Sequence, residues 1–185
     1  MSSCLRILIV LLAAGAAAAE SGVTSTIAPL GTEGGARLLE PATLPTADRA
    51  VLHKSERRLL LMKNGAVLRS YRVALGLVPF GTKERSGDFR TPEGVYQLTR
   101  RNPHSDYFLS IQVSYPNAED LQRAQRNRRD AGGSIMVHGM PNTLRHSPEY
   151  YAHTDWTDGC IALTNADMVE FWLLSPDNMT IEITP

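Results

Sequence analysis

Short alternations of apolar and polar residues begin near residue 47 and continue to the end of the chain. The stretches "RAVLHKSE" and "RRLLLMKNGAVLRSYRVALG" contain apolar runs of strand length separated by short polar breaks. Asn64-Gly65 can take positive φ at both central positions of a tight turn, so this region predicts a meander of antiparallel strands. Further strands are predicted around Val95 to Thr99 and in "YFLSIQVSY", "SIMVHGM" and "MTIEIT".

Two other stretches have helical spacing. Residues 117–130, "NAEDLQRAQRNRRD", start with Asn117 as a cap, carry acids early and bases late, and are followed by Gly132-Gly133 as a stop signal. In "TNADMVEFWLL", Thr164 or Asn165 can cap a helix whose apolar residues face a core, namely Met168, Phe171 and Trp172. The pattern therefore predicts a mostly β fold with one or two packed helices.

The N-terminal pattern is different. Arg6 precedes an apolar run from Ile7 to Ala19 that ends in small residues, which is typical of a secretory signal peptide cleaved after Ala19. The run is shorter than the ~20 residues of a membrane-spanning helix, although an uncleaved anchor stays open as an alternative. We predict a signal peptide over 1–19, a flexible leader over 20–46 that is rich in Gly, Pro, Ser and Thr, and one domain over 47–185.

The net charge of the chain excludes some classes of binding partner. The chain has 19 Lys and Arg against 19 Asp and Glu, and removal of residues 1–19 would take away only Arg6. A protein so close to neutral has no electrostatic footprint for nucleic acid or anionic lipid. We therefore expect a periplasmic or secreted protein with no nucleic-acid partner and no stable membrane insertion after signal cleavage.

The chain has two cysteines, and one of them, Cys4, lies in the predicted signal peptide. The predicted mature protein would keep Cys160 alone, whereas exported proteins usually hold their cysteines in disulfide pairs. An unpaired cysteine in that compartment is a buried bystander, an intermolecular bridge or a reactive thiol. The residues around Cys160 distinguish between these three interpretations.

Cys160 follows Gly159, and His138 stands at the end of a predicted buried strand just before Gly139. Cysteine attacks as the thiolate, so a catalytic cysteine needs a base such as histidine beside it. A glycine before the nucleophile also suits a tight turn whose backbone N–H groups face a developing oxyanion. From these residues alone, both the catalytic and the bystander interpretations of Cys160 stay open.

A metal site is a third interpretation of the segment that contains His138 and Cys160. His138, His146, His153 and Cys160 can all bind zinc, but they are spaced by seven or eight residues. No pair has the short spacing that anchors two ligands on one helix or knuckle. We therefore predict no metal and no cofactor.

Three blocks, in this order, resemble the L,D-transpeptidase (YkuD-type) catalytic domain of bacterial cell-wall enzymes: "YRVALGLVPFGTKERSGDFRTPEGVYQL", "SIMVHGMPN" and "TDGCIALTNADM". The resemblance covers nearly all of the chain after the leader. It implies an L,D-transpeptidase-like β-sandwich or barrel and acyl transfer on peptidoglycan stem peptides. Cys160 would attack a stem carbonyl, expel a terminal D-alanine and form a thioester, and His138 would move the protons.

The resemblance also assigns supporting roles. The backbone N–H groups of Gly159 and Cys160 would hold the oxyanion. Thr157 would be a hydrogen-bonding partner of the site, and Gly139 a structural support.

Two departures from the family pattern bear on the substrate. Ala162 stands where most members carry an Arg that helps to hold a substrate carboxylate, so the task could pass to Arg145 or the substrate could differ. Asp158 stands where a His is common, and a carboxylate there would tend to raise the pKa of the thiol. We take Arg145, Asp158 and His153 as candidate substrate-binding residues.

Three functions follow as hypotheses. The first is transpeptidation that crosslinks or remodels the wall. The second is hydrolysis by the same site, as an L,D-carboxypeptidase or an amidase that releases wall-anchored lipoprotein. The third is a non-catalytic wall-binding domain, which would have no need of an unpaired thiol beside a candidate base.

Overall fold

The computed structural model describes residues 44–185. The predicted signal peptide and residues 20–43 of the predicted leader lie outside the described residues. The described part contains eight strands and three helices: β1 (Arg49–His53), β2 (Arg58–Lys63), β3 (Ala66–Arg72), β4 (Gly94–Ser105), β5 (Phe108–Val113), α1 (Ala118–Arg126), β6 (Met136–His138), α2 (Pro148–His153), β7 (Ile161–Ala162), α3 (Asn165–Leu174) and β8 (Met179–Thr184).

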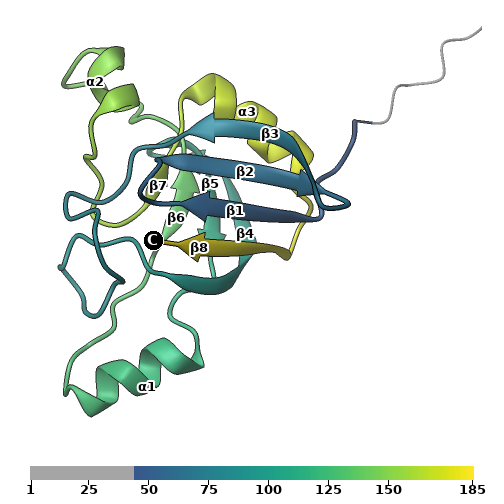
Figure 1. Cartoon of the computed structure of the whole chain (residues 1–185). Coiled ribbons are helices and arrows are strands. Elements are labelled where there is room, and N and C mark those ends of the chain that lie inside the picture. Colours follow the sequence, from purple (N-terminus) through teal and green to yellow (C-terminus); the bar gives the residue numbers. More distant parts are fainter. Residues whose placement is uncertain (1–43) are drawn as a thin grey trace, which may run out of the picture. The chain divides into compact units, whose positions relative to one another are not determined.

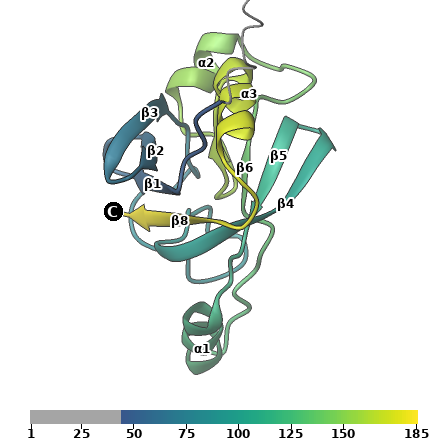
Figure 2. The same ribbon diagram turned by 90° about the vertical axis from the view of Figure 1, so that its right-hand side faces the viewer.

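The strands form one sheet in the order β3-β2-β1-β8-β4-β5-β6-β7. The β1–β8 and β6–β7 pairs are parallel, and the other pairs are antiparallel. The sheet curls strongly, as the two views in Figures 1 and 2 show. An isolated bridge between Ala74 and Ala162 joins its two ends, with Ala74 N–H donating to Ala162 O at 2.9 Å and the reverse bond at 2.8 Å. This bridge makes the curled sheet barrel-like.

The meander predicted from the hydrophobic pattern is confirmed. β1, β2 and β3 pair as antiparallel neighbours, and the β2–β3 turn has φ values of 51° at Asn64 and 80° at Gly65. A two-residue turn with positive φ at both positions matches the twist of the strands it connects, and Asn and Gly take that conformation most readily.

The inward faces of the strands meet in one hydrophobic core. Buried and half-buried residues alternate along the whole of β8, and the buried ones are Met179, Ile181 and Ile183. From α3, Met168 and Phe171 are fully buried in the same core, and Trp172 packs against it while partly exposed. The three residues predicted to face the core from this helix all do so.

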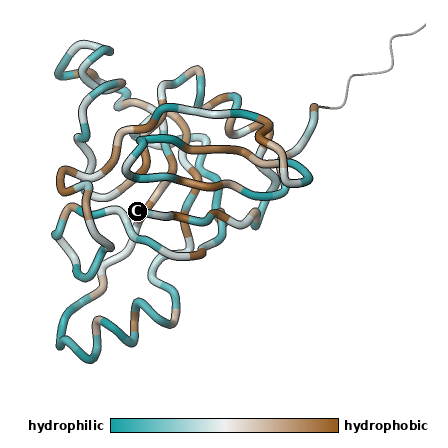
Figure 3. Tube along the Cα trace, viewed as in Figure 1, coloured by the Kyte–Doolittle hydropathy of each residue, from teal (hydrophilic) through white to brown (hydrophobic). Residues whose placement is uncertain are grey.

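The predicted count of one or two helices was too low, because the described residues contain three. α1 begins at its predicted cap, where Asn117 and Asp120 form a reciprocal capping box. It ends at Asn127 instead of Gly132-Gly133, since the N–H of Asn127 donates to Arg123 O and the N–H of Arg128 donates to Gln125 O, which closes the last turn. The tube of this helix is mostly hydrophilic, and it projects away from the sheet (Figures 1 and 3).

α2 is the helix that the sequence pattern did not predict. It has six residues, Ser147 caps it through a bond from Tyr150 N–H, and Pro148 opens its first turn. A helix this short shows too little periodicity to be recognised, although Ser-Pro is a start signal. None of the helices in residues 44–185 is both long and apolar enough to cross a membrane.

The loop from β3 to β4 is held by two buried lysines. Lys54, only 2% exposed, donates to the carbonyls of Gly81 and Thr91 and pairs with Glu93 at 2.7 Å. Burial lowers the pKa of Lys54, and the Glu93 carboxylate opposes that shift. Lys83 pairs with Asp88 at 2.8 Å, and the same carboxylate accepts three backbone N–H bonds within the loop. This loop lies beside the turn before Cys160, where Gly76 forms a β-bridge with Thr157.

Candidate active site

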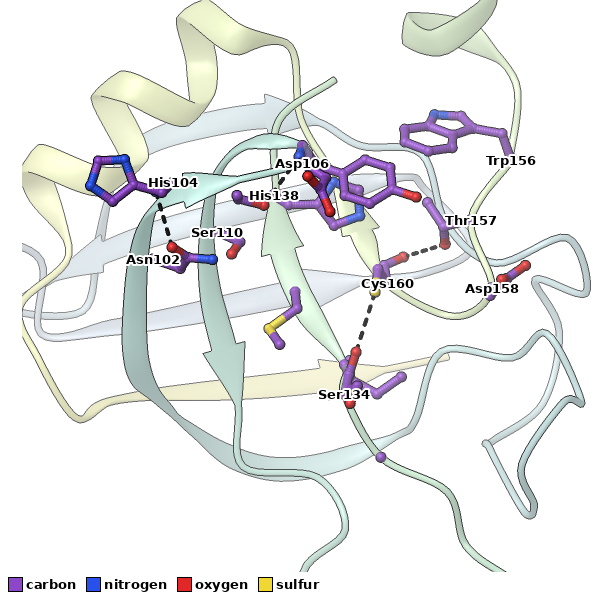
Figure 4. Close-up of a pocket in the computed structure, with 15 residues that line it drawn as sticks. Asn102, His104, Asp106, Ser110, Ser134, His138, Trp156, Thr157, Asp158 and Cys160 are labelled. Atoms are coloured by element: carbon purple, nitrogen blue, oxygen red, sulfur yellow. Dashed lines mark hydrogen bonds between the residues drawn. The ribbon is translucent and has the colours of Figure 1, made fainter. Parts of the chain in front are cut away.

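The β6–β7 pair brings the candidate histidine and cysteine together. The parallel register sets Val137 against Ile161 and His138 against Ala162. Side chains alternate between the two faces of a strand, so residue 160, two positions before Ala162, shares the face of His138. Figure 4 shows both side chains at one pocket. The pocket, which we call the thiol pocket, has a volume of about 460 Å³ and is lined by Asn102, His104, Ser105, Asp106, Tyr107, Ser110, Gly133, Ser134, Ile135, Met136, His138, Trp156, Thr157, Asp158 and Cys160.

His138 is held in one tautomer. Its Nδ1 lies 2.7 Å from the carbonyl oxygen of Gly139, and a carbonyl only accepts, so Nδ1 carries the proton. Nε2 therefore has a free lone pair, as a general base requires. Its ring centroid lies 4.7 Å from that of Tyr107 and 5.6 Å from that of Trp156. Burial lowers the pKa of His138 to about 4, so the imidazole is neutral at neutral pH.

Cys160 is a protonated thiol in the same conditions. Burial raises the pKa of Cys160, and the Asp158 carboxylate adds to the increase, whereas a backbone bond from Met136 and the charge of Lys83 oppose it. The only hydrogen bond of its sulfur as a donor, among residues 44–185, goes to Ser134 O at 3.6 Å. The resting pair is thus a neutral imidazole and a neutral thiol. Such a pair reacts by proton transfer during attack rather than as a preformed thiolate and imidazolium.

The turn before the cysteine depends on Gly159. Its φ of +125° is a conformation that residues with side chains rarely adopt, and a Cβ there would come within 2.5 Å of Arg90 O. The buried Thr157 hydroxyl accepts from Gly159 N–H at 3.2 Å and donates to Cys160 O at 2.8 Å. Thr157 therefore fixes the turn that presents the thiol. Gly159 N–H already has an internal acceptor, which leaves Cys160 N–H as the readier of the two expected oxyanion donors.

Gly139 supports the histidine. A Cβ at this position would lie 2.6 Å from the side-chain oxygen of Asn165 and 3.0 Å from Phe108. The same Asn165 oxygen accepts from Met140 N–H at 2.8 Å. Close packing here, together with the Gly139 carbonyl on Nδ1, sets the orientation of the His138 ring.

The three candidate substrate-binding residues lie in different places. Asp158 is exposed and lines the thiol pocket. Arg145 is exposed and lines a second pocket, which adjoins the first through the shared residues Asp106, Tyr107 and Trp156. His153 is exposed at the end of α2 and lines neither of these two pockets.

Several pocket residues were not singled out from the sequence. Tyr107 and Asp106 belong to the turn between β4 and β5, and nothing in "HSDYF" marks such a turn as part of a site. Ser110 faces His138 across the β5–β6 pair, and Ser134 supplies the acceptor for the thiol. Trp156 also lines the pocket, and its Nε1–H donates to Tyr151 O at 3.2 Å.

The histidines and acids of this segment do not gather into a metal site. Residues 44–185 contain no group of three or more His, Cys, Asp or Glu side chains that could hold a metal ion. The Asp155 carboxylate pairs instead with Arg57 at 2.8 Å and accepts from Leu75 N–H at 2.8 Å.

Solved structures share this barrel-like fold. The Pgp2 protein of Campylobacter jejuni, described as helical cell shape determining, is 26% identical, with a TM-score of 0.55 over 72% of this chain and 46% of that chain. An L,D-transpeptidase of Xylanimonas cellulosilytica, 16% identical, has a TM-score of 0.52 over 76% of this chain and 62% of that one. The molecule is thus of the class of L,D-transpeptidase folds.

Sequence comparison gives the family. Residues 47–183 match the YkuD family, the L,D-transpeptidase catalytic domain, and the chain belongs to this family. YafK of Escherichia coli K12, which carries the provisional name of an L,D-transpeptidase, is 31% identical over 127 residues, or 65% of this chain and 44% of YafK. The chain spans less than half the length of this relative and of Pgp2.

Proposed function

We propose that the protein is a cysteine acyltransferase that acts on peptidoglycan stem peptides in the periplasm or outside the cell. The observation that supports this most is the placement of His138 at the end of β6 and of Cys160 directly before β7, in one pocket, with Nε2 of the imidazole free. Membership of the YkuD family supports the same chemistry and substrate class.

The first half-reaction forms a thioester. As Sγ of Cys160 attacks the carbonyl carbon of the stem residue before the terminal D-alanine, its proton passes to Nε2 of His138. The oxyanion would be held by Cys160 N–H and, if Thr157 releases it, by Gly159 N–H. The intermediate collapses with loss of the D-alanine amine, which takes the proton back from Nε2.

The second half-reaction releases the acyl group. An amine of another stem attacks the thioester, gives its proton to Nε2, and the thiol is restored with a new crosslink. Water in place of the amine would shorten the stem or detach a wall-anchored protein. The thiol pocket is partly open on the solvent side through the exposed Asp106, Tyr107 and Asp158, so an external acceptor has a route to Cys160.

The test is intact-protein mass spectrometry after incubation with purified disaccharide-tetrapeptides, with products resolved by chromatography. Wild type and Cys160→Ala are compared, and Thr99→Ser, a conservative change outside the thiol pocket, serves as the control. We expect an adduct that lacks the mass of D-alanine, present in wild type and control and absent in Cys160→Ala. Crosslinked dimers would support transpeptidation.

Two other outcomes would change the proposal. An adduct with only shortened stems would assign hydrolysis instead of transfer. Absence of adduct and product with tetrapeptides, pentapeptides and intact walls would contradict the acyltransferase and favour the non-catalytic wall-binding domain.

A further inference from the structure

The second pocket lies beside the thiol pocket and has a different chemical character. Its volume is about 720 Å³, within the range of ~300–1,000 Å³ usual for ligand pockets. We call it the aromatic pocket, and it is lined by Asp106, Tyr107, Pro141, Asn142, Thr143, Arg145, His146, Tyr150, Tyr151 and Trp156. Tyr107, Trp156 and Asp106 line both pockets, so one ligand can extend from one into the other.

The rings of this pocket form a continuous series. Trp156 stacks on Tyr107 with centroids 6.0 Å apart and meets Tyr151 edge-on at 5.1 Å. Tyr151 contacts Tyr150 at 5.5 Å, and His146 lies 4.2 Å from Tyr150. Aromatic faces carry partial negative charge, which attracts the weakly positive C–H groups on the flat side of a sugar ring.

Polar groups that could meet sugar hydroxyls stand around these rings. The side chains of Arg145 and Asp106 have no hydrogen bond or ion pair within residues 44–185, and both are exposed. The Asn142 amide is already committed, since it donates to Ser105 O and accepts from Phe108 N–H, both at 2.9 Å. Arg145 and Asp106 are therefore charged side chains of the pocket that are available to a ligand.

The shape of the lining argues against an extended peptide. Peptides in extended form usually add to the free edge of a sheet through backbone bonds. The residues of the aromatic pocket come from turns, loops and α2, and none belongs to a strand. Ring faces with scattered polar side chains fit a carbohydrate better.

We propose that the aromatic pocket binds a pyranose ring of the glycan strand that carries the stem attacked by Cys160. This inference rests on the proposed function, because it takes the stem peptide in the thiol pocket as given. It assigns to Tyr150 and Arg145 a part in substrate recognition, with the buried Tyr151 packed behind them.

The distances agree with this placement. The ring centroids of His138 and Trp156 are 5.6 Å apart and those of Trp156 and Tyr151 are 5.1 Å apart, so His138 and Tyr151 are separated by no more than about 11 Å. Three stem residues in extended form, the number from the sugar to the attacked carbonyl, span about 10 Å at ~3.3–3.6 Å each. A stem seated at Cys160 is thus long enough for its own sugar to reach the aromatic pocket.

The experiment measures binding in the Cys160→Ala protein, which cannot turn over the ligand. Calorimetry compares the disaccharide-tetrapeptide with the same tetrapeptide freed from its sugars. We expect the sugar-bearing ligand to bind about fivefold to tenfold more tightly, as one aromatic stack allows. Adding Tyr150→Leu should remove this difference while the affinity for the free peptide changes less than about twofold. Phe80→Leu, which alters a 72% exposed ring outside both pockets, is the matched control and should keep the difference.

Equal affinities for the two ligands would overturn the inference. An equal loss for both ligands in the Tyr150→Leu protein would also overturn it, since that result assigns Tyr150 to packing or to peptide contact. Mass spectrometry of wild-type Cys160 after incubation with each ligand distinguishes a failure of the glycan site from a failure of the proposed function. Acylation without a sugar preference defeats only the glycan site, whereas no binding and no acylation with either ligand defeats the proposed function as well.

Discussion

At the scale of single residues, the candidate site combines a base that resists protonation with a thiol that resists ionisation. Both shifts have burial as their main cause, because the thiol pocket and its aromatic wall remove water from the imidazole and the sulfur. The consequence is a neutral pair over a wide range of pH, which stays unreactive until a substrate carbonyl is in place.

The lowered pKa of His138 predicts a loss of stability in acid. The folded pKa of about 4 lies below the ordinary value of ~6.5, so the unfolded chain takes up the proton first as pH falls. His138 should therefore lower the free energy of unfolding by roughly 3 kcal/mol between pH 7 and pH 4, and the effect should level off below pH 4. Urea denaturation of wild type and His138→Gln across this range measures it. Parallel pH profiles for the two proteins would contradict the buried neutral imidazole.

Asp158 predicts a change in thiol reactivity. Its carboxylate raises the pKa of Cys160, so Asp158→Asn should lower that pKa and speed alkylation by iodoacetamide at neutral pH. The rate of modification, followed by mass spectrometry against pH, gives the thiol pKa in each protein. Asp106→Asn is the control within the same pocket and should leave the profile near that of wild type. An unchanged profile in Asp158→Asn would mean that burial alone sets the pKa.

At the scale of elements, the segment from β6 to β7 carries His138 at one end and Cys160 at the other, with α2 between. The end that carries Cys160 is held in place by Asp155, whose carboxylate accepts hydrogen bonds from Arg57 and from Leu75 N–H. These partners lie after β1 and after β3, so the tie connects the site to the predicted meander.

Removing this tie should destabilise the fold. We expect Asp155→Ala to lower the free energy of unfolding by about 1–3 kcal/mol, because the buried Leu75 N–H loses its acceptor and Arg57 loses its partner. Asp177→Ala is the matched control, since Asp177 is 71% exposed and its pair with Arg101 should contribute less than about 1 kcal/mol. Urea denaturation at pH 7 compares the two, and equal midpoints would show that the tie is not structural.

The strands other than the two-residue β7, and two of the helices, could be predicted because their signals are local. Asn64-Gly65 sets a turn, and Asn117 and Thr164 cap helices within three residues of chain. The candidate His138 and Cys160 could also be chosen, since both follow from residue type and motif. Tyr107, Asp106 and Ser134 could not, because their place at the pocket depends on how the β4–β5 turn and the chain before β6 pack in space.

Arg145 illustrates the same limit. Its charge made it a candidate for the role of the Arg that the family carries at position 162, but sequence gives no direction to a side chain in a loop. The structure places it in the aromatic pocket rather than the thiol pocket. Ala162 itself is 3% exposed and forms the bridge to Ala74, so the position serves the closure of the sheet.

At the scale of the whole molecule, β8 lies between β1 and β4 and joins the meander to the half of the sheet that holds the site. Within residues 44–185, the β-pairing between the two halves other than through β8 consists of the isolated bridges of Ala74 with Ala162 and of Gly76 with Thr157. A chain that ends at Asn178 should therefore lose cooperative unfolding and the ordered aromatic environment of the site. Near-ultraviolet circular dichroism and urea denaturation test this, and a chain that ends at Ile183 is the control. A cooperative transition in the shorter chain would contradict the central role of β8.

The position of β8 also bears on when the protein can fold. β8 follows every other strand in the chain, so it leaves the ribosome last among them, at rates of ~5–20 residues per second. Until it emerges, β1 lacks its parallel neighbour and β4 lacks one of its two partners. The growing chain consequently stays open until β8 emerges, which is the state that the export proposed above requires for passage through a translocation channel. Under that proposal, the closed sheet around Cys160 would be assembled only after transport.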